Sequence, residues 1–186
     1  MAQPDDGPRI PPVTEPDAEQ AELLAKTLPT TSGRPLNVFA TLAHNPRLLG
    51  RFNALGGYFL RYGTLSARDR ELVILRVAAL TGSRYEEAQH LVLGAQAGLT
   101  PEEMDEVRGP VDSWSGADGV LMRFVDEMYH SDGADVTSWE ALAERYPVDR
   151  MIEVTVLVGY YRMLAGFLNV VGVQVEDDGA TAPRGA

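Results

Sequence analysis

Residues 66–90 read SARDRELVILRVAALTGSRYEEAQH, and this stretch decides the fold. Ser66 followed by Asp69 is the pattern of a helix N-cap, and Gly82 is a typical helix end. Between them, the run ELVILRVAAL is apolar on nearly every face, so the helix that it forms must be covered on all sides. Ser83 followed by Glu86 predicts a capping box that opens a second helix. The stretch therefore predicts two adjacent helices, the first of them buried.

The rest of the sequence keeps the same helical period. Apolar residues show no sustained alternation of the kind that predicts strands. Caps and apolar spacing predict further helices from Asn45 to about Tyr62, from Thr100, from Asp118 to about His130, from Thr137, and from Val148 to Val171. A chain of 186 residues with 45% apolar content suits one domain with a real core. We therefore expect an all-α, single-domain helical bundle.

The two ends of the chain differ in composition from the part between them. Residues 1–16 contain five prolines among acidic and small residues, and residues 176–186 are polar and contain Gly and Pro. Such segments bury too little apolar surface to offset their loss of conformational entropy on folding. The sequence predicts a mobile or draped arm over 1–16, a helical domain over 17–175 and a disordered tail over 176–186.

The composition excludes several classes of function. A formal net charge of −11 argues against nucleic-acid and membrane-surface partners, because both call for clustered Lys and Arg. The absence of cysteine excludes disulfides, thiolate metal sites and thiol peroxidase chemistry. The three histidines are far apart in sequence, so we expect no metal site.

No feature of the sequence predicts a secreted or membrane protein. We expect no apolar run to approach the roughly 20 residues that a membrane-spanning helix needs. The N-terminus MAQPDDGPRIPPV also lacks the basic-then-apolar layout of a signal peptide. The expected location is the cytoplasm.

Glu71 and His90 form the candidate catalytic pair. A carboxylate and an imidazole that meet in a buried cleft can transfer a proton, because burial and mutual interaction bring both pKa values toward neutrality. Each residue also has a structural explanation. An acid in the first turn of a helix is favoured by the helix dipole, and a lone histidine on a helix is often only a hydrogen-bonded structural residue.

The same stretch resembles the carboxymuconolactone decarboxylase and alkylhydroperoxidase D-like superfamily, whose signature is a glutamate, a C-x-x-C pair and a histidine four residues after the second cysteine. Counting back from His90, Glu86 and Ser83 stand at the cysteine positions, and the glutamate falls on Glu71. The resemblance continues through NVFATLAHNPRLLGRFNALGGYFL and GLTPEEMDEV and covers about 36–173. It implies the superfamily's bundle and, without thiols, its decarboxylase-like, non-redox branch.

Four further residues are candidates for the site. Glu86 serves as a helix cap or as a second acid or base, and Tyr85 donates a hydrogen bond to substrate or simply packs. Arg76 interrupts an apolar helix, so it pairs with a buried carboxylate, plausibly Glu71 or Glu153, or with a substrate carboxylate. Tyr161 lies on the final long helix, where aromatic residues line the pocket floor or belong to the core.

The resemblance implies a cofactor-independent acid/base enzyme, most specifically a carboxy-lyase acting on a small organic acid or lactone. In this hypothesis His90 is the principal acid or base and Glu71 orients it, with Glu86 as a relay or substrate contact. Isomerisation or lactone hydrolysis by the same residues, and a non-catalytic oligomer that binds a small ligand, stay open. Two helices without a polar stripe call for a partner subunit, and the resemblance implies a homotrimer or hexamer, with a dimer as the alternative.

Overall fold

The computed structural model describes residues 7–177, and within this range the regular structure is helical. No strand forms there, and β pairing is limited to an isolated bridge between Pro29 and Pro35. The predicted all-α class is confirmed. The helices are α1 (Ala18–Leu24), α2 (Asn37–Leu42), α3 (Pro46–Arg61), α4 (Ala67–Thr81), α5 (Arg84–Gln96), α6 (Pro101–Glu106), α7 (Gly116–Ser131), α8 (Val136–Arg145) and α9 (Val148–Val171), with a 3₁₀ turn at Val111–Ser113.

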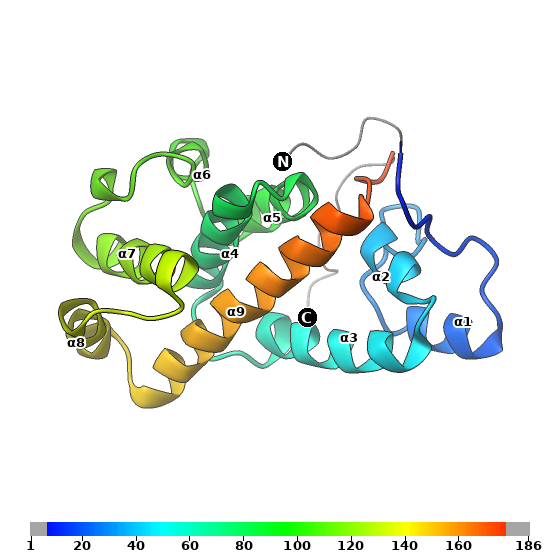
Figure 1. The fold of residues 1–186 in the computed structure, drawn as a ribbon, viewed down its shortest axis with the longest axis horizontal. Helices are drawn as coiled ribbons and strands as arrows, with labels where there is room; N and C mark the ends of the chain where they lie inside the picture. The colour runs from blue at the N-terminus through cyan, green and yellow to red at the C-terminus, as the bar shows by residue number, and fades with distance from the viewer. Residues whose placement is uncertain (1–6, 178–186) are drawn as a thin grey trace.

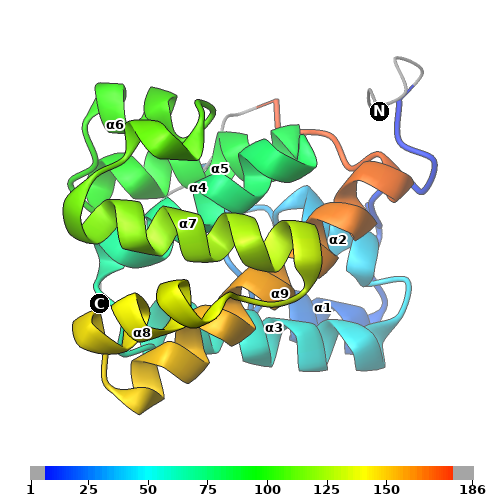
Figure 2. The same cartoon turned by 60° about the vertical axis from the view of Figure 1, so that its left-hand side comes forward.

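Helix α4 is the central element of the bundle. It packs against α9, α5 and α7, and α7 packs in turn against α8. Figure 1 shows α1, α2 and α3 at one end of the molecule and α6, α7 and α8 at the other, with α4, α5 and α9 between them. Figure 2 shows α7 and α8 stacked beside the long α9. Residues from most of the chain therefore meet around α4.

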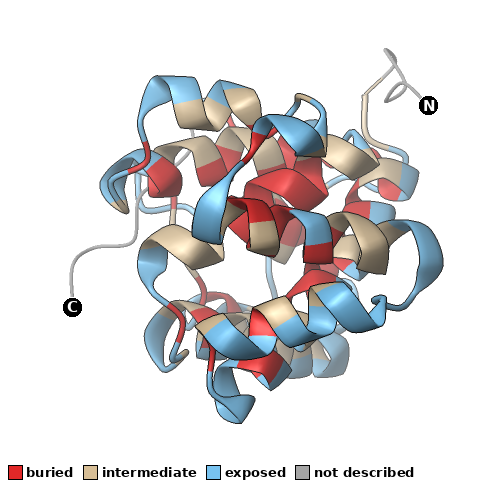
Figure 3. Cartoon of the chain, turned by 90° about the vertical axis from the view of Figure 1, so that its left-hand side faces the viewer, coloured by how far each residue is buried: buried red, intermediate tan, exposed pale blue. Residues whose placement is uncertain are grey.

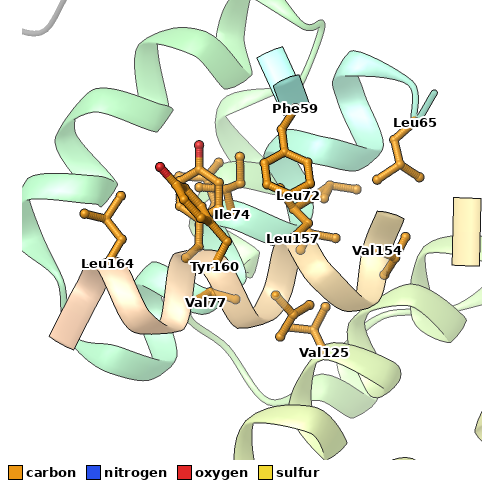
Figure 4. Close-up of a cluster of buried hydrophobic side chains, with 14 of the residues drawn as sticks. Phe59, Leu65, Leu72, Ile74, Val77, Val125, Val154, Leu157, Tyr160 and Leu164 are labelled. Atoms are coloured by element: carbon orange, nitrogen blue, oxygen red, sulfur yellow. The ribbon is translucent and has the colours of Figure 1, made fainter. Parts of the chain in front are cut away.

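The predicted burial of α4 is confirmed. Every residue from Glu71 to Ala78 is buried, including two that are ionisable. Buried residues lie on the inward faces of the surrounding helices, and exposed residues lie outside them (Figure 3). In Figure 4, Phe59 of α3, Leu72 of α4, Val125 of α7 and Leu157 of α9 meet in one apolar cluster. The core therefore joins segments that are up to about a hundred residues apart in sequence.

Most helix ends follow their local sequence signals. Asn45 caps α3 by accepting from the Leu48 amide, with Pro46 in the first turn, and Gly82 ends α4 with a φ of 64°. Helix α8 differs from the prediction, because Asp135 caps it by accepting from Ser138 rather than Thr137 doing so. An aspartate two residues upstream therefore takes the capping role.

Both ends of the described chain pack on the bundle. The Arg9 amide donates to the Val171 carbonyl at 2.8 Å, and the Val13 amide donates to the Ala40 carbonyl at 3.1 Å. Glu176, where the tail was predicted to begin, is buried. Residues 1–6 and 178–186, which hold the rest of the predicted arm and tail, lie outside the described residues.

Helix α9 passes a test of length and composition for a membrane-spanning helix. The expectation that no apolar run approaches that length was therefore wrong for its 24 residues. Half of its most apolar window is nevertheless buried inside the protein, and core helices of soluble proteins pass the same test. One such helix is weak support for a membrane.

Glu153 of α9 fixes the connection between α3 and α4. Its buried carboxylate accepts hydrogen bonds from the Thr64 amide at 2.6 Å, the Thr64 hydroxyl at 2.7 Å and the Leu65 amide at 3.3 Å. This one side chain satisfies the donors of a turn that is about 90 residues away in sequence.

Replacing Glu153 tests this contact. Glu153→Ala should lower the free energy of unfolding by about 2–3 kcal/mol, because it removes the acceptor of the buried Leu65 amide and of the Thr64 amide and hydroxyl. Glu153→Gln keeps one acceptor oxygen and should lose clearly less. Urea denaturation of both variants measures the difference, and equal losses would show that the negative charge, not the hydrogen bonds, holds the turn.

Candidate active site

A cavity of about 290 Å³ lies where α3, α5 and α9 meet beside α2. Its wall is mostly apolar and aromatic, and its polar side chains are concentrated on α5. The residues of α5 that line it are Tyr85, Glu86, Gln89, His90 and Leu93. The apolar and aromatic lining includes Phe39, Phe52, Tyr160, Tyr161, Leu164 and Leu168, and Lys26, Asn53 and Arg61 are polar lining residues outside α5. The cavity is therefore mostly apolar, with a polar wall formed by α5.

Glu71 and His90 are brought together as the sequence predicts. The Nδ1 atom of His90 lies 2.7 Å from Oε2 of Glu71, and the Nε atom of Arg70 donates to Oε1 at 2.9 Å. Burial raises the pKa of Glu71, but the charges and hydrogen bonds of His90 and Arg70 outweigh burial and lower it below 4.5. An ionised carboxylate requires a proton on Nδ1, which leaves Nε2 as the ring nitrogen available to a ligand.

His90 separates Glu71 from the cavity. Glu71 is fully buried and does not line the cavity, whereas His90 does. The ring of His90 also contacts Tyr161 edge to face, with centroids 5.1 Å apart. Burial raises the pKa of Tyr161 well above 10, so its phenol stays protonated. The imidazole is therefore held from behind by a carboxylate and from the side by an aromatic ring.

Glu86 lines the same cavity one helical turn before His90. Only 2% of it is exposed, and neither carboxyl oxygen has a hydrogen-bond partner among residues 7–177. Burial raises its pKa well above 4.5, and the nearby Ser83 hydroxyl opposes this shift only weakly, without closing a hydrogen bond. Burial therefore favours the protonated form of the Glu86 carboxyl group, which lies beside an apolar space.

The capping box predicted from Ser83 and Glu86 does not form. Ser83 stands at the N-cap position of α5, but its hydroxyl makes no capping hydrogen bond. Packing takes both side chains into the interior instead, where Ser83 is 1% exposed. This correction favours the alternative in which Glu86 serves the site.

Tyr85 has a partner that the sequence did not indicate. Its hydroxyl donates to Oε1 of Glu176 at 2.6 Å, and the same carboxylate accepts from Gln89 and from the Asn37 amide. Burial and the neighbouring Glu176 raise the pKa of Tyr85, so it stays protonated. Glu176 and Gln89 were missed because no local pattern links α5 to the end of the chain.

Arg76 lies outside the cavity, so the interpretation as a substrate-binding residue is not supported by its position. Its guanidinium makes two hydrogen bonds of 2.6 Å to the Asp126 carboxylate and two of 2.7 Å to the carbonyls of Val107 and Gly109. Five residues separate it from Glu71, which places it about 140° around α4. Arg76 is a structural residue, and Asp126 is its partner rather than Glu71 or Glu153.

Two comparisons with known proteins bear on the family. Residues 46–125 match the model of the carboxymuconolactone decarboxylase family. No match to the sequence was found among curated proteins. The predicted resemblance to this family is confirmed over this segment.

Several solved structures share the fold. The alkylhydroperoxidase AhpD core, an uncharacterized peroxidase-related protein from Ralstonia eutropha JMP134, superposes with a TM-score of 0.70 at 20% identity over 79% of this chain and 80% of that one. A peroxidase-related protein from Silicibacter sp. TM1040 gives 0.69 at 17% identity, covering 89% and 96%. The debrominase Bmp8 gives 0.71 at 17% identity, covering 91% and 92%.

The superfamily's two cysteine positions are occupied by Ser83 and Glu86 in this chain. The described residues also contain no group of three His, Asp or Glu side chains that could hold a metal ion. The polar side chains that the cavity offers to a bound molecule include Glu86, Gln89 and His90.

The buried acid predicts a pH dependence of stability. The folded pKa of Glu86 lies above the unfolded value, so its favourable contribution is present below about pH 4.5 and is lost as the pH rises through the folded pKa. Glu86→Gln removes this titration. The free energy of unfolding of Glu86→Gln relative to wild type should therefore rise as the pH increases above 4.5, by about 1.4 kcal/mol for each unit of pKa elevation, and its relative melting temperature should rise with it.

Thermal melts of wild type and Glu86→Gln across pH 5–9 measure this difference. Glu87→Gln is the matched control, because Glu87 forms a partly exposed pair with Arg108. A constant offset between wild type and Glu86→Gln over the whole range would contradict the neutral state of Glu86.

Proposed function

We propose that the chain is a cofactor-independent enzyme that transfers protons on a small oxygenated organic molecule bound in this cavity. The observation that supports this most directly is the pair of groups on its polar wall. Glu86 is a carboxyl group whose burial favours the protonated form, and His90 is an imidazole with a negative carboxylate behind it. A carboxyl group and an imidazole on one wall can supply an acid and a base to the same bound molecule.

The proposed reaction is proton transfer next to a carbonyl group. His90 Nε2 takes a proton from the carbon beside the carbonyl, while the Glu86 carboxyl gives its proton to the carbonyl oxygen, which forms a neutral enol. The imidazolium is stabilised by Glu71. It then returns its proton to another carbon of the conjugated system as Glu86 recovers its own, and the product is an isomer of the substrate.

Decarboxylation, which the family match implies, is the second candidate reaction. In this version carbon dioxide leaves a carboxylated substrate, the electrons enter a conjugated carbonyl, and His90 or Glu86 protonates the resulting carbon. Lys26 and Arg61 line the same cavity and supply positive charge for such a substrate. Lactone hydrolysis and ligand binding without catalysis are the remaining alternatives.

Proteins with this fold are named for different reactions. One of them is a debrominase, and two are called peroxidase-related. Thiol peroxidase chemistry requires cysteine, which this sequence lacks. Acid/base chemistry uses only the groups that the cavity contains.

Deuterium exchange tests the proposal without knowledge of the natural substrate. Unsaturated lactones and cyclic ketones, with and without a carboxylate, are incubated with the protein in D₂O, and loss of the proton beside the carbonyl is followed by NMR. Wild type should accelerate exchange of at least one compound. His90→Ala should reduce that rate by about 10²–10⁴-fold, because it removes the base.

His44→Ala is the matched control, because His44 is an exposed histidine that contacts the Pro11 carbonyl instead of the cavity. Circular dichroism checks that both variants stay folded. Exchange that persists in His90→Ala at the wild-type rate would refute the assignment of His90.

Self-association stays a prediction, and α9 is where it is best tested. Its outward face exposes Ile152, Val156, Met163 and Val170, whose spacing places them along one side of the helix. We propose that a second copy covers this face. Met163→Glu should lower the molecular mass measured by light scattering, whereas Glu140→Gln on α8 should not.

A further inference from the structure

Two carboxylates lie behind the polar wall of the cavity. Glu71 lies directly behind His90, and Glu176 lies behind Tyr85 and Gln89. Arg70 is hydrogen-bonded to Glu71 and does not line this cavity. A ligand carboxylate placed against this wall would lose its hydration and would face like charge.

The positive charges that line the cavity lie at its exposed end. Lys26 and Arg61 are both solvent-exposed. Lys26 is also paired with Glu22 at 2.8 Å. Exposed cations interact weakly with an anion because water screens them. They therefore do not compensate for the cost of burying a carboxylate at the inner wall.

The remaining surface suits a ring. Phe52 and Phe39 line the cavity together with Tyr160, and the Phe52 and Tyr160 rings are 4.9 Å apart. An apolar cavity of about 150 Å³ in another protein holds one benzene molecule. At about 290 Å³, this cavity has room for a substituted ring or two fused rings.

We infer that the cavity selects an uncharged cyclic ketone or lactone over the corresponding carboxylate, with the carbonyl oxygen accepting a hydrogen bond from the Glu86 carboxyl. This inference rests on the proposed function, since it takes the same cavity as the reaction site. An uncharged substrate fits isomerisation of a neutral carbonyl compound. It does not fit decarboxylation, which requires an acid.

The test compares two probes of nearly the same shape. Coumarin is an uncharged bicyclic lactone, and coumarin-3-carboxylate is its anionic counterpart. Isothermal titration calorimetry at pH 7 should give coumarin a dissociation constant at least tenfold lower. Equal or tighter binding of the carboxylate would overturn the inference, and so would the absence of binding by both probes at millimolar concentration.

Two variants of Glu86 identify the hydrogen bond. Glu86→Gln keeps an N–H donor and should retain coumarin binding to within about threefold, whereas Glu86→Leu should weaken it about tenfold. Melting curves confirm that both variants fold. Unchanged coumarin binding in Glu86→Leu would show that the carboxyl does not contact the carbonyl. If the carboxylate binds more tightly and Arg61→Ala removes that preference, the substrate is an acid held at the rim.

The binding test and the deuterium-exchange test can fail independently of each other. Preference for coumarin without exchange of any compound would leave the ligand class in place and remove the proposed enzyme. Exchange that occurs only with carboxylated compounds would keep the enzyme and overturn the ligand class.

Discussion

The buried carboxylate of Glu71 constrains both the fold and the site. It lies within an apolar helix, where an isolated negative charge costs several kcal/mol, so it requires donors from its neighbours. His90 on α5 and Arg70 on α4 supply them. Because this bond uses Nδ1, the histidine has a fixed ring orientation and tautomer, with Nε2 left for the cavity. One interaction therefore joins α4 to α5 and fixes the orientation of the imidazole at the cavity wall.

The same helix carries a second buried charge with a different consequence. Arg76 is about 140° around α4 from Glu71 and meets Asp126 of α7 together with two backbone carbonyls. The hydrogen bonds of Arg76 join it to other parts of the protein. Glu71, in contrast, contacts His90, and His90 lines the cavity. A helix covered on every face can hold charges only where each adjoining segment supplies a partner. The polar cluster toward α7 is thus structural, and the one toward α5 adjoins the cavity.

The number of residues between two interacting side chains decides whether their interaction can be predicted from the sequence. The cap at Asn45 and the stop at Gly82 use only neighbouring residues, and both are confirmed. The Glu71 and His90 pair was predictable because two adjacent helices keep the superfamily's spacing. The partners of Arg76 and Tyr85 lie 50 and 91 residues away and have no local signal. The capping box predicted at Ser83 has a clear local signal but does not form, because tertiary packing takes Glu86 into the cavity wall instead.

Position 86 is where this sequence departs from the signature that it resembles. The superfamily signature places a thiol there, and a thiol pair exchanges electrons through a disulfide. A carboxyl group has no such redox reaction, but burial favours its protonated form, which can donate a hydrogen bond or a proton. In this chain Glu86 lines the cavity together with His90, whose Nδ1 atom is held by Glu71, so a carboxyl group stands where the signature has a thiol. The proposed acid/base chemistry rests on this exchange of a thiol for a carboxyl group.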